Sequence, residues 1–202
     1  NPKLEMDVQG GIMKPGENQL EGSTTEWYTM QNFVAAKADN HQILLSSKEI
    51  PLVMLGHLLD GPFQYKKEYT KPSVYSWVMN NYWETNFRAS QEGEIRWQYT
   101  ITSSQGNDDT DALKFALGDR VQAYARVLPE GVKDKKPMEG SFLEITDDNL
   151  TVTAICPARK KGYVILQVRE TSGLENRTLS LTSRGKKLRF DKVDALEEVH
   201  KA

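Results

Sequence analysis

The chain has 202 residues, a formal net charge of −2 at pH 7 and a hydrophobic share of 38%. This length is enough for one large or two small hydrophobic cores, and the composition is that of a globular protein rather than a disordered one. The balanced charge, with no long basic block, argues against a nucleic-acid partner. No apolar run approaches the roughly 20 residues of a transmembrane helix, and the first residues lack the apolar region of a signal peptide. We therefore expect a soluble protein with no membrane partner and no targeting signal, and Asn1 in place of an initiator Met indicates an excised or processed piece.

Short apolar or alternating runs, separated by clusters of Gly, Pro, Asn, Asp and Ser, predict a mainly β protein with an antiparallel β-sandwich. Residues 1–22 carry four glycines and few apolar side chains, so any strands there are expected to depend on contacts with a missing half. Further strands are expected at residues 27–35, 42–46, 52–55, 94–103, 122–128, 141–145, 150–156, 163–170, 177–182 and 187–190.

One or two short helices are expected, the clearest of them near residues 110–117. Asp109 or Thr110 is placed to cap its start and Gly118 to end it. Residues 129–140, a lysine-rich stretch bracketed by Pro and Gly, form the best linker in the sequence. We therefore expect a main β-sandwich region at residues 1–130 and C-terminal strands at residues 131–202. These strands could pack on the same sandwich.

Residues 73–104 hold three of the four tryptophans, and their second half has a clear strand pattern. Ile95, Trp97, Tyr99 and Ile101 alternate with polar residues, which is the period of a half-buried strand, so these four side chains are predicted to face the core.

The first half of the same stretch mixes amides, hydroxyls and aromatic rings. Amides and hydroxyls both donate and accept hydrogen bonds, and aromatic rings offer flat apolar area, a combination suited to a sugar or a second protein surface. The alternative is an aromatic-rich core turn whose amides cap backbone groups. The candidate residues for a carbohydrate cleft or domain interface are Asn80, Asn81, Trp83, Thr85 and Asn86.

The string MNNYWETNF at residues 79–87, followed by Gly93 and IRWQYTITS, resembles the C-terminal region of the glycoside hydrolase family 38 α-mannosidases. Three further blocks fall in the family's order, TEWYTMQNFV at residues 25–34, EIPLVMLGHL at 49–58, and the run at 141–173 that includes SFLEITDD and VILQVRETSG. The resemblance implies a galactose-mutarotase-like supersandwich fold and a carbohydrate (α-mannoside) substrate for the parent enzyme.

In that family the zinc ion, its His and Asp ligands and the Asp nucleophile lie in an N-terminal α/β barrel, which this chain does not contain. The resemblance therefore implies that the chain is a non-catalytic C-terminal β region, with no cofactor of its own and with the barrel of the same polypeptide as its partner. It also implies that the stretch from Asn80 to Asn86 faces the barrel at the rim of the cleft.

Chemical motifs in the chain itself are sparse. The three histidines, His41, His57 and His200, are too far apart for a local metal site, and the common hydrolase and nucleotide motifs are missing. We therefore expect no catalytic and no metal-binding residues in this stretch. Adjacent Asp pairs at residues 108–109 and 147–148 are interpreted as caps of backbone amides. The single cysteine, Cys156, lies in an alternating run and is expected on the inner face of a strand.

Two other functions stay open on the sequence. A mutarotase-like sugar epimerase would need a histidine and a glutamate that converge on a sugar, and His57 with Glu84 or Glu94 are the candidates. A free-standing carbohydrate-binding module would need exposed flat rings, and Trp27, Trp77 and Trp83 are the candidates for these.

Overall fold

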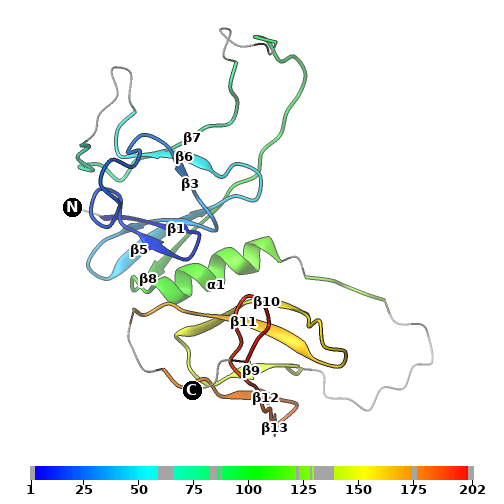
Figure 1. Ribbon diagram of the computed structural model, residues 1–202. Helices are drawn as coiled ribbons and strands as arrows, with labels where there is room; N and C mark the ends of the chain where they lie inside the picture. The colour runs from blue at the N-terminus through cyan, green and yellow to red at the C-terminus, as the bar shows by residue number, and fades with distance from the viewer. Residues whose placement is uncertain are drawn as a thin grey trace. The chain divides into compact units, whose positions relative to one another are not determined.

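The computed structural model describes residues 3–58, 66–81, 86, 88–121, 123–127, 129, 139–173 and 177–199. Over these residues the protein is mainly β, every strand pairing is antiparallel, and one helix is present, as the sequence predicts (Figure 1). The chain divides into two compact units, Asn1–Val121 (unit 1) and Gln122–Ala202 (unit 2). The domain boundary expected between residues 130 and 131 lies outside the described residues.

Unit 1 is built on a five-stranded sheet, sheet A. The N-terminal segment is an interior strand of this sheet, and it pairs on one side with the strand that follows it and on the other with residues 34–37. Met6 and Asp7 in this segment have no exposed surface, so residues 3–8 form a buried interior strand that the glycine-rich composition did not predict. The strand order is β2 (Gly11–Met13), β1 (Lys3–Val8), β4 (Val34–Lys37), β5 (His41–Ser46) and β8 (Thr100–Gln105).

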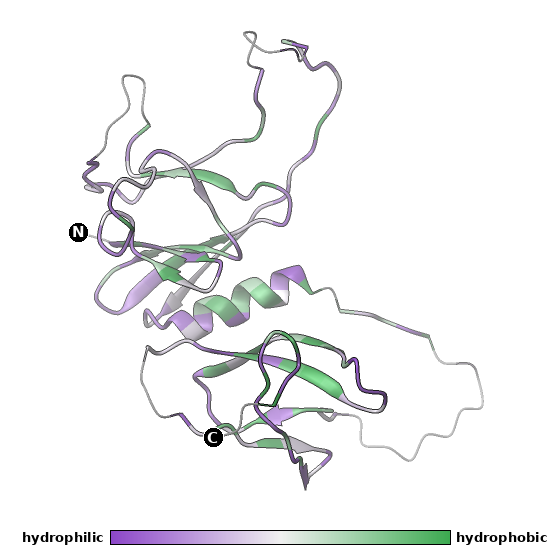
Figure 2. Ribbon diagram, viewed as in Figure 1, coloured by the Kyte–Doolittle hydropathy of each residue, from purple (hydrophilic) through white to green (hydrophobic). Residues whose placement is uncertain are grey.

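A second, three-stranded sheet packs against one face of sheet A. Its order is β3 (Tyr28–Thr29), β6 (Leu52–Leu55) and β7 (Val74–Ser76). Figure 2 shows hydrophobic residues along β6, and buried side chains from both sheets form one cluster. The hydrophobic effect therefore holds the two sheets together through Leu4, Met6, Tyr28, Met30, Val34, Val53 and Leu55.

The helix α1 (Asp109–Arg120) covers the other face of sheet A. Because side chains alternate along a strand, Ala35 and its partner Leu44 point away from the second sheet, and they pack with Leu113 of α1. The Asp108 side chain caps the helix, accepting a hydrogen bond of 2.6 Å from the Thr110 backbone N–H. Gly118 lies inside the helix, which ends at Arg120, so the prediction that Gly118 ends it is wrong.

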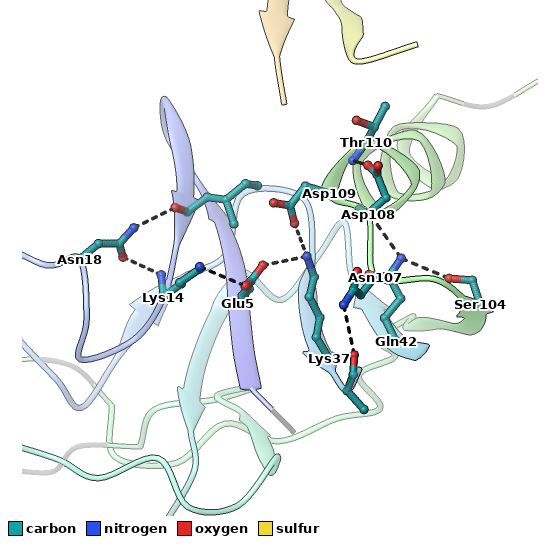
Figure 3. Close-up of polar contacts among 12 residues, drawn as sticks. Glu5, Lys14, Asn18, Lys37, Gln42, Ser104, Asn107, Asp108, Asp109 and Thr110 are labelled. Atoms are coloured by element: carbon teal, nitrogen blue, oxygen red, sulfur yellow. Dashed lines mark hydrogen bonds and ion pairs between the residues drawn. The ribbon is translucent and has the colours of Figure 1, made fainter. Parts of the chain in front are cut away.

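Charged side chains at the start of α1 join it to sheet A (Figure 3). Lys37 lies between two carboxylates, with its Nζ 2.7 Å from Glu5 Oε2 and in contact with Asp109 Oδ1. Burial lowers the Lys37 pKa, but hydrogen bonds and charge attraction from Asp109 and Glu5 outweigh burial and raise the pKa above its ordinary value. Burial raises the pKa of Asp109, and the Glu5 charge adds to this, against the opposing effect of Lys37.

Tyr69 links three loops of unit 1. Its hydroxyl bonds the Tyr28 hydroxyl and donates to the Thr25 carbonyl at 3.3 Å. Burial and the Tyr28 hydrogen bond raise the Tyr69 pKa well above its ordinary value. The ring fits against two glycines at positive φ, where a Cβ on Gly16 or Gly56 would lie 3.0 or 3.2 Å from the ring atoms.

Unit 2 contains a two-stranded and a three-stranded sheet. The hairpin of β10 (Leu150–Pro157) and β11 (Val164–Glu170) is the longer, and Figure 2 shows hydrophobic residues along β11. Residues 154–157 of β10 are exposed on both faces, so this end of the strand has no covered side, and Cys156 is exposed and not on an inner face as expected. The second sheet has the order β13 (Lys186–Lys187), β12 (Leu181–Ser183) and β9 (Glu144–Ile145).

The expected strands fare unevenly. The predictions at residues 42–46, 52–55, 150–156 and 163–170 are confirmed as β5, β6, β10 and β11. Residues 27–35 split into β3 and β4, because the chain crosses between the two sheets there. Residues 123–127 form no strand, and the strands predicted at 141–145, 177–182 and 187–190 are shorter, as β9, β12 and β13.

The strand predicted at residues 94–103 starts later than expected, and the opposite face of it is covered. The strand β8 begins at Thr100, and its inner face carries Thr100, Thr102 and Ser104, while Ile101 is 68% exposed. The polar side faces inward because α1 supplies its partners, as when Thr100 Oγ1 donates to Asp119 Oδ1 at 2.6 Å. Alternation fixed the period correctly but not the face that is covered.

Candidate functional site

The candidate site lies in the segment that joins β7 to β8, residues 77–99, here called the β7–β8 loop. Figure 1 shows the described parts of this loop projecting beyond the strands of unit 1. Its base is closed by side chains, because Tyr99 Oη donates to Ser76 Oγ at 2.9 Å and Glu49 Oε2 accepts from the Gln98 backbone N–H at 2.7 Å. The sheets therefore hold both ends of the loop in place.

An aromatic pair sets the direction in which the chain leaves β7. The Trp77 ring lies with its centre 4.0 Å from that of Trp27, at an interplanar angle of 54°. The Trp77 indole N–H donates to the Met79 carbonyl at 2.6 Å, and its backbone N–H donates to the Leu52 carbonyl at 2.9 Å. These contacts fix the backbone directly before Asn80.

A cavity of about 440 Å³ opens within the β7–β8 loop. One wall comes from the exit of β7 and the other from the part of the loop that returns toward β8. Its side chains include amides, a hydroxyl, a guanidinium and one carboxylate, so the lining both donates and accepts hydrogen bonds. The lining residues are Asn80, Asn81, Arg88, Ser90, Gln91 and Glu92.

The structure brings together part of the predicted site. Asn80 and Asn81 line the cavity and are exposed, and Asn86 is exposed within the same loop. Trp83 and Thr85 lie outside the described residues. The opposite wall was not predicted, although the polar run RASQE that continues from the motif carries it at residues 88–92. A search for polar runs beyond the aromatic cluster would have found it.

The described lining residues form a polar surface that carries one carboxylate, Glu92. Amides beside a guanidinium and a carboxylate form a directional hydrogen-bonding surface, which suits hydroxyl groups of a sugar or the polar backbone of a second protein.

The described residues hold no group of three or more His, Cys, Asp and Glu side chains arranged for a metal ion. His41 is exposed at the start of β5, and His200 lies outside the described residues. His57 follows β6 and hydrogen bonds through Nε2 to Thr70 Oγ1 at 2.8 Å.

The residues named for the two other functions are dispersed. His57 and Glu94 do not line the cavity, and Glu94 forms an ion pair of 2.5 Å with Arg96, while Glu84 lies outside the described residues. Trp27 and Trp77 pack on each other, and both side chains are half-buried.

Comparison with known proteins found no matching family model, no similar curated protein and no similar solved structure. The helix α1, with 12 residues, is too short to cross a membrane, and no other described segment forms a helix that could.

Proposed function

We propose that this chain is the C-terminal, non-catalytic β region of an α-mannosidase of the glycoside hydrolase family 38 type. In this proposal it supports an N-terminal catalytic barrel of the same polypeptide, and the β7–β8 loop forms part of the rim of the carbohydrate-binding cleft. The zinc ion and the catalytic carboxylates belong to the barrel, and this chain supplies binding surface.

The observation that carries the proposal is the position of the cavity. Two of its lining residues, Asn80 and Asn81, belong to the MNNYWETNF block on which the family resemblance rests. The start of the block therefore lies at a polar concavity.

The energetics of polar groups favour a surface position for this segment. A buried amide or hydroxyl without a hydrogen-bond partner costs about 1 to 3 kcal/mol, so a core would rarely receive so many within one short segment. Asn80, Asn81 and Asn86 are exposed in this chain. A barrel surface or a sugar that meets them would supply partners for their donors and acceptors.

The architecture is compatible with the finer fold that the proposal requires. The two sheets of unit 1 share one hydrophobic cluster, as the layers of a sandwich do, and all their strands are antiparallel.

The first test is the parent reading frame. A sequence upstream of Asn1 that encodes an α/β barrel with a His-x-Asp element is the expected result, and an upstream region of another class would exclude the proposal.

The isolated chain is expected neither to hydrolyse aryl α-mannosides nor to retain stoichiometric zinc after dialysis against a weak chelator, because a hydrolytic zinc site needs about three convergent ligands. Turnover or retained zinc would contradict it.

The second test addresses the cavity in the parent enzyme. Asn81→Ala and Arg88→Ala are expected to raise KM for α-mannosides by about tenfold, the effect of losing roughly one hydrogen bond of about 1.4 kcal/mol, while the zinc content stays unchanged. Lys161→Ala, an exposed change in the turn between β10 and β11, is the matched control and should leave KM as it is. Equal KM values in all four proteins would remove the cavity from the cleft.

A further inference from the structure

The outer edge of β8 is the longest open strand edge in unit 1. Sheet A ends at β8 on this side, and no described strand pairs with its outer edge. The other strands at the ends of the two sheets, β2, β3 and β7, have three, two and three residues, and short edge strands limit unwanted pairing. The six residues of β8, TITSSQ, contain neither the charged side chains nor the proline that commonly protect an edge strand.

The open edge extends backwards beyond β8. Residues 94–99 have the alternating, aromatic and β-branched composition of a strand, yet they belong to no ladder. The Gln98 backbone is engaged on the side toward β5, where its N–H donates to Glu49 at 2.7 Å and its carbonyl accepts from Ser47 Oγ at 2.8 Å. In a regular antiparallel strand the neighbouring odd-numbered residues then direct their N–H and C=O groups to the free edge.

The side chains on these odd-numbered residues are apolar over residues 95–101. Ile101 is 68% exposed, and Ile95 and Tyr99 are each 37% exposed. Apolar side chains and unpaired backbone groups therefore lie along the same edge. A second strand is the one occupant that satisfies both, because it supplies hydrogen bonds to the backbone and cross-strand contacts to the side chains.

We propose that two copies of this chain pair antiparallel along residues 94–102, with Gln98 on the two-fold axis. In this register the odd-numbered residues exchange the backbone hydrogen bonds, and apolar residues meet apolar residues, as Ile95 faces Ile101 and Trp97 faces Tyr99 of the other copy. Glu94 and Arg96 face Thr102 and Thr100, so no like charges oppose each other. A two-fold contact requires a surface that is complementary to itself, and this edge meets the requirement.

The pairing joins the two copies of sheet A into one continuous sheet. It does not involve the cavity of the β7–β8 loop, and it stands whether or not the proposed mannosidase function is correct.

The test begins with the mass in solution. Light scattering on the purified chain at micromolar concentrations is expected to give twice the chain mass of 22.9 kDa. Ile101→Lys is expected to weaken the dimer by about tenfold or more, because two symmetric Ile–Ile contacts are lost. Ile43→Lys, a similarly exposed position one strand further in, is the matched control and should leave the mass unchanged. A monomeric wild type, or equal dissociation by both variants, would overturn the proposal.

A crosslink tests the register without disturbing the apolar contacts. In a Cys156→Ser background, Gln98→Cys should form a disulfide-linked dimer with oxidised glutathione, because the two residues face each other at a close, non-hydrogen-bonded position. Ser103→Cys lies on the same exposed edge but faces no cysteine in this register, so it should stay unlinked. Linkage at Ser103 but not at Gln98 would show that the proposed pairing is wrong.

Discussion

Unit 1 and unit 2 are both built from antiparallel strands, but they differ in what those strands bury. In unit 1, sheet A has a second sheet on one face and α1 on the other, and side chains such as Phe33 and Met6 lose all their exposed surface. In unit 2 the buried hydrophobic side chains among the described residues are Leu150 and Leu181, whereas Phe142 is 75% exposed. Alternating apolar residues form strands in both units, but a hydrophobic core forms only where two layers pack against each other. We therefore expect the stability of the chain to reside in unit 1.

The largest expected effect is at Phe33, which has no exposed surface between sheet A and α1. Phe33→Ala should lower the free energy of unfolding by about 3 to 5 kcal/mol, since it removes a buried ring and leaves a cavity. Phe190→Ala in unit 2, where the ring is 51% exposed, is the control and should cost clearly less. Urea unfolding followed by tryptophan fluorescence measures both, and equal losses would refute the contrast between the units.

The next effect concerns the charges beneath α1. Lys37→Met should cost about 3 kcal/mol, because it leaves the Glu5 and Asp109 carboxylates close together without their cation. The exposed pair of Arg96 and Glu94 provides the comparison, and Arg96→Met should cost less than about 1 kcal/mol. Denaturant midpoints give both values. If Lys37→Met were as mild as Arg96→Met, the network would be a surface feature and not a joint between helix and sheet.

A smaller effect is expected at alkaline pH. Tyr69 has a pKa raised from its ordinary 10.0, so the stability it contributes is complete below pH 10 and is lost as pH rises toward its folded pKa. Lys37 and Tyr28, whose pKa values are also raised, act in the same direction. Tyr69→Phe should cost about 1 kcal/mol at pH 7 for the lost hydrogen bond and should flatten the decline above pH 10. Thermal melts from pH 8 to pH 11 would contradict this if the two declines were parallel.

The smallest effect is expected at Trp83. In the proposed function this ring lies at a surface that the proposed catalytic barrel covers, so Trp83→Ala should leave the thermal midpoint of the chain nearly unchanged while weakening the activity of the proposed parent enzyme. Trp77→Ala is the contrast, because the Trp77 ring packs against Trp27 and its indole N–H is hydrogen bonded, and it should lower the midpoint. If Trp83 is a core ring, its removal should cost about 3 to 5 kcal/mol and the loop is a structural turn.

The fold could be predicted where the apolar residues of a strand are also the residues that other elements cover. The apolar runs of β5 and β6 lie within unit 1, and their bounds were predicted to within a residue. The first strand was missed because its core position depends on pairing with β4, more than twenty residues away, and Asp7 at 0% exposure has no apolar signal. At β8 the alternation was correct, but α1 covers the polar side of the strand. The alternation of residues within a strand does not predict which side a later helix will cover.

The candidate site was half predictable for a related reason. Asn80 and Asn81 stand out as amides beside aromatic rings, which is a local feature of composition. Arg88 and Glu92 resemble ordinary surface charges, and only the return of the chain toward β8 brings them to the opposite wall of the cavity. A short stretch of sequence does not predict that a loop folds back on itself.

The position of β8 in the chain has a consequence for the order of folding. Ser46 pairs with Thr100, so β6, β7 and the β7–β8 loop must all be accommodated before sheet A is complete, whereas β4 and β5 are joined by a short turn. Pairings between distant segments form slowly, because the entropy of loop closure opposes them until the contacts are made. We therefore expect β8 to join last and its amides to be the first in sheet A to exchange with solvent. A partner strand paired with the outer edge of β8 would then stabilise the product of the final folding step.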